Sequence, residues 1–210
     1  MPRRILLVES PDDVHVVKHI CGNREIPKLD EIKPHKSVEA VVESLPVRLK
    51  ASEQGDIIGV ILDADTSLSS RWHSIRDRLI DLGYPDVPDN PVTGGTIVDA
   101  PPDSILPRMG VWLMPDNQHP GKLEDFLRFL IPAPSALFDH VTASVSTIPE
   151  GCRLFKESDE IKAVIHTWLA WQERPGKPFG TAITAQYLDP TVPQVDVLAS
   201  WLRRLFYSQA

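Results

Sequence analysis

Apolar and polar positions alternate along the first two thirds of the chain in a pattern that predicts strands followed by helices. The apolar runs over residues 3–8 and 56–63 are typical of short strands buried on both faces of a sheet. After the first run, Ser10 is placed to cap a helix that has proline in its first turn and continues to Gly22. A strand followed by a helix is the opening of a parallel α/β unit.

Further segments repeat this alternation. The predicted helices cover residues 37–51, with a kink or division at Pro46, then 68–82 and 122–130, and the predicted strands cover 28–33, 95–100 and 108–114. These elements predict an α/β fold with a mainly parallel central sheet flanked by helices. Half of the 20 prolines fall between Pro85 and Pro134, which predicts a loop-rich middle region.

The last part of the chain has a different pattern. Apolar residues at helical spacing over 161–169 and 195–205 predict two amphipathic helices, separated by the proline- and glycine-containing segment 174–180. We therefore expect a sheet-forming domain over residues 1–150 and a helical C-terminal extension over residues 151–210 that packs on the same core.

Charge and cysteine content limit the classes of function. The chain has 210 residues, with 22 Lys and Arg against 29 Asp and Glu, and its formal net charge of −7 excludes a generic basic coat for nucleic acid. Cys21 and Cys152 form no zinc-binding pattern. No apolar run approaches the roughly 20 residues of a membrane span. We expect a cytoplasmic protein that does not enter a membrane.

Acidic residues stand where the predicted strands end. Glu9 follows the first strand and Asp116 follows a later one. Asp63 and Asp65 close the central strand two residues apart, so in an extended chain their side chains face the same way. Because the carboxyl ends of parallel strands form the ligand crevice of such a sheet, we expect these four carboxylates to converge. Converging carboxylates repel one another unless a cation lies between them, and hard oxygen ligands favour Mg²⁺ or Mn²⁺.

The residues around these acids resemble the signature of the Toprim domain. The sequence Leu7-Val8-Glu9-Ser10-Pro11 is similar to the first Toprim motif, in the form that type IA topoisomerases commonly carry. The sequence Leu62-Asp63-Ala64-Asp65 is similar to the second motif, an Asp-x-Asp pair. The stretch from Pro115 to Phe126 resembles the third acidic region of OLD-family nucleases and of small Toprim-related proteins of unknown function. The layout of the chain matches this last group best.

The resemblance implies roles for individual residues. Glu9 corresponds to the family glutamate, which acts as a general base or as a metal ligand. Asp63 and Asp65 correspond to the aspartates that hold the metal. Asp116 and Glu124 would complete or support a second metal site.

The activity implied is that of a nuclease, a phosphodiesterase dependent on Mg²⁺ or Mn²⁺ that acts on nucleic acid, with DNA as the expected substrate. A late lysine assists catalysis in OLD-like sites, and Lys177 or Lys162 could take that role. OLD-like nucleases join a Toprim module to an ATPase, whereas this sequence contains no Gly-x-x-x-x-Gly-Lys phosphate loop. We therefore expect self-association or a complex with a separately encoded ATPase, in defence against phage or other foreign DNA.

Other interpretations of the same residues stay open. A Toprim fold could act as a binding or regulatory module without turnover, which the acidic net charge favours. The segment 4–13 also resembles the opening of a receiver domain with Asp63 as phosphoacceptor, although this explains neither the Asp-x-Asp pair nor the length of the chain. His15 and His19 are one helical turn apart and could share a metal, but the sequence places no third ligand beside them.

Overall fold

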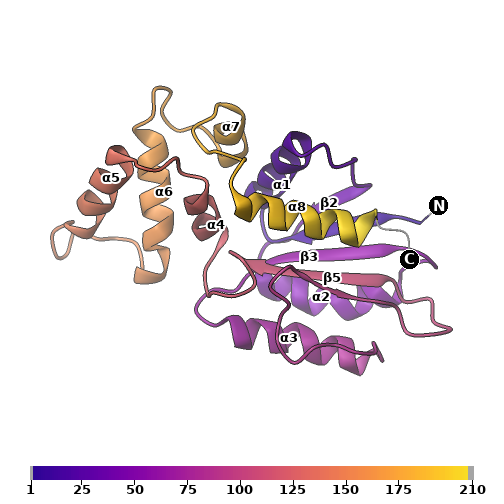
Figure 1. The fold of residues 1–210 in the computed structure, drawn as a ribbon. Coiled ribbons are helices and arrows are strands. Elements are labelled where there is room, and N and C mark those ends of the chain that lie inside the picture. The colour runs from indigo at the N-terminus through magenta and orange to yellow at the C-terminus, as the bar shows by residue number, and fades with distance from the viewer. Residues whose placement is uncertain (1, 208–210) are drawn as a thin grey trace.

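A computed structural model describes residues 2–207 and contains one mainly parallel sheet. The strands are β1 Arg4–Val8, β2 Glu31–Pro34, β3 Ile57–Asp63, β4 Thr96–Val98 and β5 Arg108–Met114. They lie in the order β2–β1–β3–β5–β4, and every neighbouring pair is parallel except β4 and β5, which are antiparallel. The predicted α/β class with a mainly parallel sheet is confirmed, and its flanking helices give it a Rossmann-like layout (Figure 1).

Helices cover both faces of this sheet. They are α1 Pro11–Asn23, α2 Val38–Lys50, α3 Leu68–Asp81, α4 Leu123–Phe129, α5 Ala136–Ser146, α6 Glu160–Ala170, α7 Phe179–Thr184 and α8 Pro193–Phe206, with a short 3-10 turn, η1 Glu157–Asp159, before α6. In Figure 1, α1 and α8 lie over one face of the sheet and α2 and α3 over the other. Helices α4, α5 and α6 form a lobe beside one end of the sheet (Figure 1).

Alternation along the strands assigns side chains to the two faces. Leu6 and Val8 of β1 join the apolar cluster under α1 and α8, whereas Ile5 and Leu7 join the cluster under α2 and α3. A strand that is buried on both faces has a continuous run of apolar residues in its sequence. This is the pattern that predicts β1 and β3.

Two strand glycines allow α8 to lie close to the sheet. Gly59 and Gly110 are paired in the register of β3 and β5. A Cβ atom on Gly59 would lie 2.9 Å from the Cδ2 atom of Leu205, and one on Gly110 would lie only 2.3 Å from it. Because real Cβ contacts are not this short, a side chain at either position would push α8 away from the sheet.

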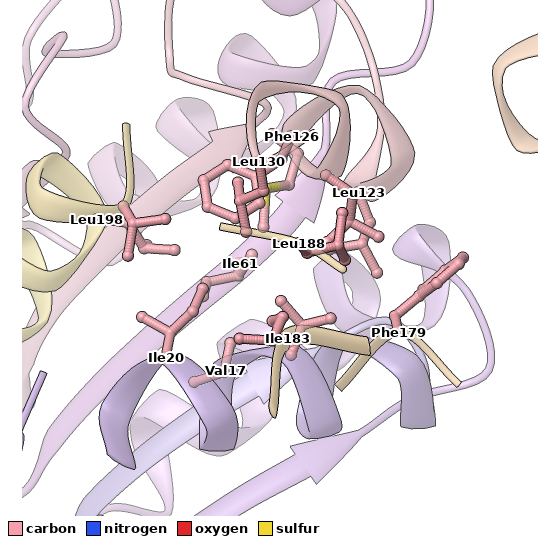
Figure 2. Close-up of a cluster of buried hydrophobic side chains, with 14 of the residues drawn as sticks. Val17, Ile20, Ile61, Leu123, Phe126, Leu130, Phe179, Ile183, Leu188 and Leu198 are labelled. Carbon is pink, nitrogen blue, oxygen red and sulfur yellow. The ribbon is translucent and has the colours of Figure 1, made fainter. Parts of the chain in front are cut away.

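The cluster under α1 and α8 also includes side chains from the lobe and from α7. Figure 2 shows apolar side chains of α1, β3, α4, α7 and α8 gathered together, among them Val17, Ile61, Leu123, Ile183 and Leu198. The C-terminal helices therefore share a core with the sheet. Within the lobe, the rings of Phe138 in α5 and Trp168 in α6 pack edge-on, with 6.5 Å between their centroids. Because α5 precedes residue 150 and α6 follows it, this contact crosses the expected domain boundary.

Some elements differ from the sequence expectations. Helix α2 runs through Pro46 without a division, because the burial of Val42, Leu45 and Leu49 compensates for the hydrogen bond that proline cannot donate. Strand β2 begins at Glu31, later than predicted. Helix α5 is not predicted by the apolar pattern, and α7 starts inside the segment predicted to separate the two C-terminal helices. Within residues 2–207, no helix has the length and apolar character needed to cross a membrane.

Candidate active site

The first site residues come from the junction of β1 and α1. Glu9 directly follows β1, and Ser10 caps α1 by accepting a hydrogen bond from the backbone N–H of Asp13 at 3.4 Å. In return, the Oδ2 atom of Asp13 accepts from the backbone N–H and the hydroxyl of Ser10, at 2.9 and 2.6 Å. This capping box holds the buried Asp13 carboxylate close to the end of β1.

A backbone hydrogen bond connects Glu9 to Asp63. The Oε1 atom of Glu9 accepts from the backbone N–H of Asp63 at 2.5 Å. Strands β1 and β3 are parallel neighbours, so their carboxyl ends bring these two residues together, as predicted. The Oδ1 atom of Asp63 accepts from the backbone N–H of Leu123, the first residue of α4, at 2.9 Å. Both carboxylates are therefore held by backbone groups of other elements.

These residues line a cavity of about 190 Å³ between the carboxyl ends of β1 and β3 and the lobe. We call this cavity the acidic cleft. Its charged lining residues are the acids Glu9, Asp12, Asp13, Asp63, Glu124 and Asp159 and the bases Lys122 and Lys162. Glu124, which the resemblance assigns to a second metal site, is thus in the same cleft as Glu9 and Asp63 and is buried.

The buried carboxylates of the acidic cleft favour their protonated forms. Burial raises the pKa of Asp63, and the charge of Glu9 raises it further. Burial also raises the pKa of Glu9, although the hydrogen bond from the Asp63 backbone acts in the opposite direction. Burial raises the pKa of Asp13 to about 6, against the opposing hydrogen bonds from Ser10. Near neutral pH this group of acids therefore stabilises a proton or another cation among them.

Two lysines of the chain already supply positive charge. Lys122 Nζ lies 3.1 Å from an oxygen of Asp159 and 3.9 Å from an oxygen of Asp65. Partial burial opposes the charge of Lys122, but the hydrogen bond to Asp159 and the nearby carboxylates outweigh it and raise the pKa of the lysine. Lys162 Nζ lies 3.8 Å from an oxygen of Glu124. Lys122 also connects the lobe, through Asp159, to the end of β3.

The side chains of Asp65 and Asp63 do not point the same way. The chain leaves the extended conformation at Asp65, where φ is 51°, and the backbone N–H of Asp65 donates to the carbonyl of Gly121 at 2.9 Å. The Oδ2 atom of Asp65 lies 2.6 Å from Nη2 of Arg71, and Asp65 lines a neighbouring cavity rather than the acidic cleft. The expectation that both aspartates face the same way was wrong, because it assumed extended backbone through Asp65.

Two further sequence candidates lie elsewhere. Asp116 accepts hydrogen bonds from the backbone N–H groups of Gln118 and His119 at 3.0 and 2.9 Å, and its Oδ2 atom lies 2.8 Å from His119 Nδ1. It lines a separate cavity beside Trp112. Lys177 lies in the loop before α7 and is not among the residues that line the acidic cleft, whereas Lys162, the alternative lysine, is.

Several residues of this region are not among the sequence-predicted site residues. Asp13 carries a usable signal, since Ser-x-x-Asp directly after a strand predicts a capping box whose acid stays at the sheet edge. Lys122 directly precedes α4, and α4 is the helix that follows β5, the strand next to β3. Its position between a strand and a helix could therefore have identified it. Asp159 carries no local signal, because only tertiary packing brings it to Lys122 beside the end of β3. Arg71 lies near the start of α3, the helix that follows β3, so its contacts with Asp63 and Asp65 are local in sequence.

The chemistry of the oxygen donors suits a hard divalent cation, but several of these oxygens already have partners within the chain. Among residues 2–207, no group of three or more His, Cys, Asp or Glu is arranged to hold a metal ion. One oxygen each of Glu9 and Asp63 accepts a backbone N–H, and Asp65 and Glu124 pair with cationic side chains. The second oxygens of Glu9 and Asp63 take part in no hydrogen bond within the described part of the chain and are left as donors to a cation.

Comparison with known proteins gives a family but no activity. The family described as "Protein of unknown function (DUF3226)" matches residues 3–207. Neither a curated protein nor a solved structure matches the chain. Because the family match spans the sheet, the acidic cleft and the C-terminal helices, the chain belongs to the DUF3226 family.

Proposed function

We propose that this chain is a nuclease of the Toprim type, a phosphodiesterase that depends on Mg²⁺ or Mn²⁺ and acts on DNA. One observation carries the proposal: the Glu9 carboxylate reaches the backbone of Asp63 at the carboxyl ends of two adjacent parallel strands. The Toprim signature places its glutamate and the first aspartate of its Asp-x-Asp pair at the ends of such strands. The raised pKa values of both groups add support, because perturbed carboxylates in a cleft are typical of catalytic sites.

The residues of the acidic cleft would have different roles in the reaction. A divalent cation bound at such carboxylates would supply Lewis-acid activation of a phosphoryl oxygen and of water. Asp63 would hold the cation through the oxygen that does not accept from Leu123. Glu9, with its raised pKa, is suited to accept a proton near neutral pH or to ligate beside Asp63. Lys162 and Lys122 are placed to stabilise negative charge on a phosphodiester in the cleft.

Asp65 would join the site only after a local change. Its carboxylate now pairs with Arg71 and Lys122, so the full Asp-x-Asp pair requires at least one of these ion pairs to give way. A divalent cation carries more charge than either ammonium or guanidinium group and offers the carboxylate a stronger partner.

A plasmid assay tests the proposal. Supercoiled DNA is incubated with the protein and Mn²⁺ or Mg²⁺, and conversion to the nicked circle is followed on a gel. We expect metal-dependent nicking by the wild-type chain and none by Asp63→Asn, which keeps the hydrogen bond from Leu123 but removes the charge. Asp139→Asn, an exposed acid on α5, is the matched control and should nick like the wild type. Equal nicking by Asp63→Asn would refute the assignment.

A second candidate is a Toprim-fold binding or regulatory module without turnover. The ion pairs favour it, since Asp65, Glu124 and Asp159 all have cationic partners from the chain itself. This module would bind without nicking, so oligonucleotide or cation binding combined with an inactive wild-type chain distinguishes it from the nuclease.

We also propose that the nuclease works with a partner, either a second copy or a separately encoded ATPase, in defence against foreign DNA. The net charge of −7 gives poor attraction to a polyanion, and the partner would supply the DNA-holding surface and the control of cleavage. Size-exclusion chromatography with light scattering, alone and after co-expression with neighbouring genes, tests this. A strictly monomeric chain with robust turnover by itself would contradict it.

A further inference from the structure

A second cavity, of about 170 Å³, borders Asp65 and extends along the start of α3. Its polar lining differs in kind from that of the acidic cleft. Four hydroxyl side chains and one guanidinium group line it, and they belong to Thr66, Ser67, Ser70, Ser74 and Arg71. Asp65 is the one acid in the lining. We call this the hydroxyl pocket.

The charge of Asp65 is already balanced. Its Oδ2 atom lies 2.6 Å from Arg71 Nη2, and its Oδ1 atom lies 3.9 Å from Lys122 Nζ. Lys122 is closer to Asp159, at 3.1 Å, so Arg71 is the cation that neutralises Asp65. The neutralised carboxylate offers little to a cation, whereas an anion can reach the unused N–H donors of Arg71. The hydroxyl pocket is therefore not a second metal site.

Arg71 has donors to spare for such an anion. Its Nε atom donates to the carbonyl of Asp63 at 2.9 Å, and Nη2 donates to Asp65. A guanidinium group carries five N–H bonds, and in residues 2–207 these two contacts are the hydrogen bonds that Arg71 makes through its side chain. The two anchored N–H groups fix the plane of the guanidinium and leave the others free to donate.

Hydroxyl groups beside a fixed guanidinium are the side chains that recognise phosphate oxygens. Serine, threonine and arginine supply a large part of the contacts that proteins make to the backbone of nucleic acids. The Ser67 hydroxyl donates to the Ser70 hydroxyl at 2.9 Å, and the Ser70 hydroxyl can in turn donate its own proton to an oxyanion. An apolar ligand would leave the Ser70 hydroxyl proton and the unused N–H groups of Arg71 without a partner, which is costly.

We propose that the hydroxyl pocket binds a backbone phosphate of the nucleic acid strand, next to the phosphodiester that lies in the acidic cleft. This inference rests on the proposed function, whose substrate it specifies. Asp63 lines the cleft and Asp65 lines the pocket, and two residues of chain span at most about 7 Å. One strand can therefore reach both, and Arg71 acts as the positioning residue between them.

A pair of charge substitutions tests the proposal. Ser70→Asp places a carboxylate in the hydroxyl pocket, whereas Ser69→Asp places the same charge one residue away on the same exposed turn of α3, outside the pocket. Both variants gain the same favourable acid near the start of the helix, so their folding should be alike. Binding of a fluorescent single-stranded oligothymidylate is measured by anisotropy in EDTA at low salt.

We expect Ser70→Asp to weaken oligothymidylate binding at least about tenfold, because like charges repel, and Ser69→Asp to stay within about twofold of the wild type. Ser70→Ala should give a smaller loss and confirms the role of the hydroxyl if the aspartate variant fails to fold. Equal losses in the Ser69 and Ser70 variants would overturn the proposal. Inorganic phosphate that protects the wild type against heat, with oligothymidylate binding insensitive to Ser70→Asp, would assign the pocket to free phosphate and overturn it too.

The same experiment separates this inference from the nuclease activity. Because the binding assay contains no divalent cation, it does not depend on turnover. A chain that fails to nick DNA but loses oligothymidylate binding on Ser70→Asp would retain the phosphate pocket and refute the phosphodiesterase. If the chain nicks DNA and Ser70→Asp leaves the KM unchanged, the phosphodiesterase is supported and the phosphate pocket is refuted.

Discussion

The Oε1 atom of Glu9 accepts a hydrogen bond from the backbone N–H of Asp63 at 2.5 Å. This contact joins the ends of β1 and β3, and it brings the two carboxyl groups close enough for the charge of Glu9 to raise the pKa of Asp63 in a partly desolvated cleft. Without a cation between them, both are pushed toward their protonated forms.

The cation-free protein should lose stability as the pH rises from about 4 to 8. The pKa of Asp13 is raised from 3.8 to about 6, and those of Glu9 and Asp63 are raised as well. A raised carboxyl pKa means that the folded state binds protons more tightly than the unfolded state. Its stabilising effect is therefore complete below pH 3.8 and disappears as the pH passes about 6, with an upper limit of about 3 kcal/mol for the buried Asp13.

Thermal unfolding in EDTA at constant ionic strength measures this dependence. The midpoint of unfolding should be lower at pH 8 than at pH 5. A midpoint that rises over this interval would mean that the buried carboxylates are matched by cations already present in the chain.

Replacing Asp63 with asparagine should stabilise the cation-free protein at pH 8. Asparagine keeps an acceptor for the backbone N–H of Leu123 and removes one of the charges that repel Glu9. The expected gain in free energy of unfolding is about 1–2 kcal/mol, measured by urea denaturation. Asp139→Asn, the matched control on α5, should change it by less than about 0.5 kcal/mol. A destabilised Asp63→Asn variant would show that repulsion at this position is already compensated.

Lys122 of the acidic cleft should matter more than Lys177, one of the two lysines that the sequence suggests. Lys122→Gln removes the ion pairs with Asp159 and Asp65 and should cost about 1–2 kcal/mol, because the lysine is only 21% exposed. Lys177→Gln, in the loop before α7, should cost less than about 0.5 kcal/mol and leave any nicking activity unchanged. Equal effects of the two substitutions would contradict the assignment of Lys122 to the site.

The close approach of α8 to the sheet predicts opposite effects for two glycine substitutions. Gly110→Ala puts a methyl group 2.3 Å from Leu205 and should destabilise the protein by about 1–3 kcal/mol. Gly22→Ala, near the end of α1, meets no atom within 4 Å and should be neutral or stabilise by up to about 1 kcal/mol. Urea unfolding of both variants checks the pair. Similar values would mean that α8 does not pack against the strand glycines.

Local patterns explain which parts of the structure could be predicted. The continuous apolar runs of β1 and β3 predict buried parallel strands, and parallel pairing then predicts that Glu9 and Asp63 meet. The turn at Asp65 could not be predicted, because its left-handed backbone depends on the hydrogen bond to Gly121, a distant residue. The same holds for α5, whose burial comes from packing on α6 rather than from a strong pattern of its own.

Tertiary packing also decides which of the two candidate lysines lies in the acidic cleft. Lys162 and Lys177 are equally plausible in the sequence, and only the placement of α6 beside α4 brings Lys162 to Glu124. Asp116 has a local partner in His119, which the sequence spacing permits but does not require. Tertiary packing therefore decides which of the acids and bases form the acidic cleft.

Binding of Mn²⁺ measured by electron paramagnetic resonance tests the central claim most directly, because bound Mn²⁺ no longer contributes to the sharp signal of the free ion. At pH 8 we expect the wild-type chain and Asp139→Asn to remove Mn²⁺ from solution, and Asp63→Asn to bind far less. If the wild type binds no Mn²⁺, or if Asp63→Asn binds it equally well, then Glu9 and Asp63 do not form a metal site and the proposed nuclease mechanism is wrong.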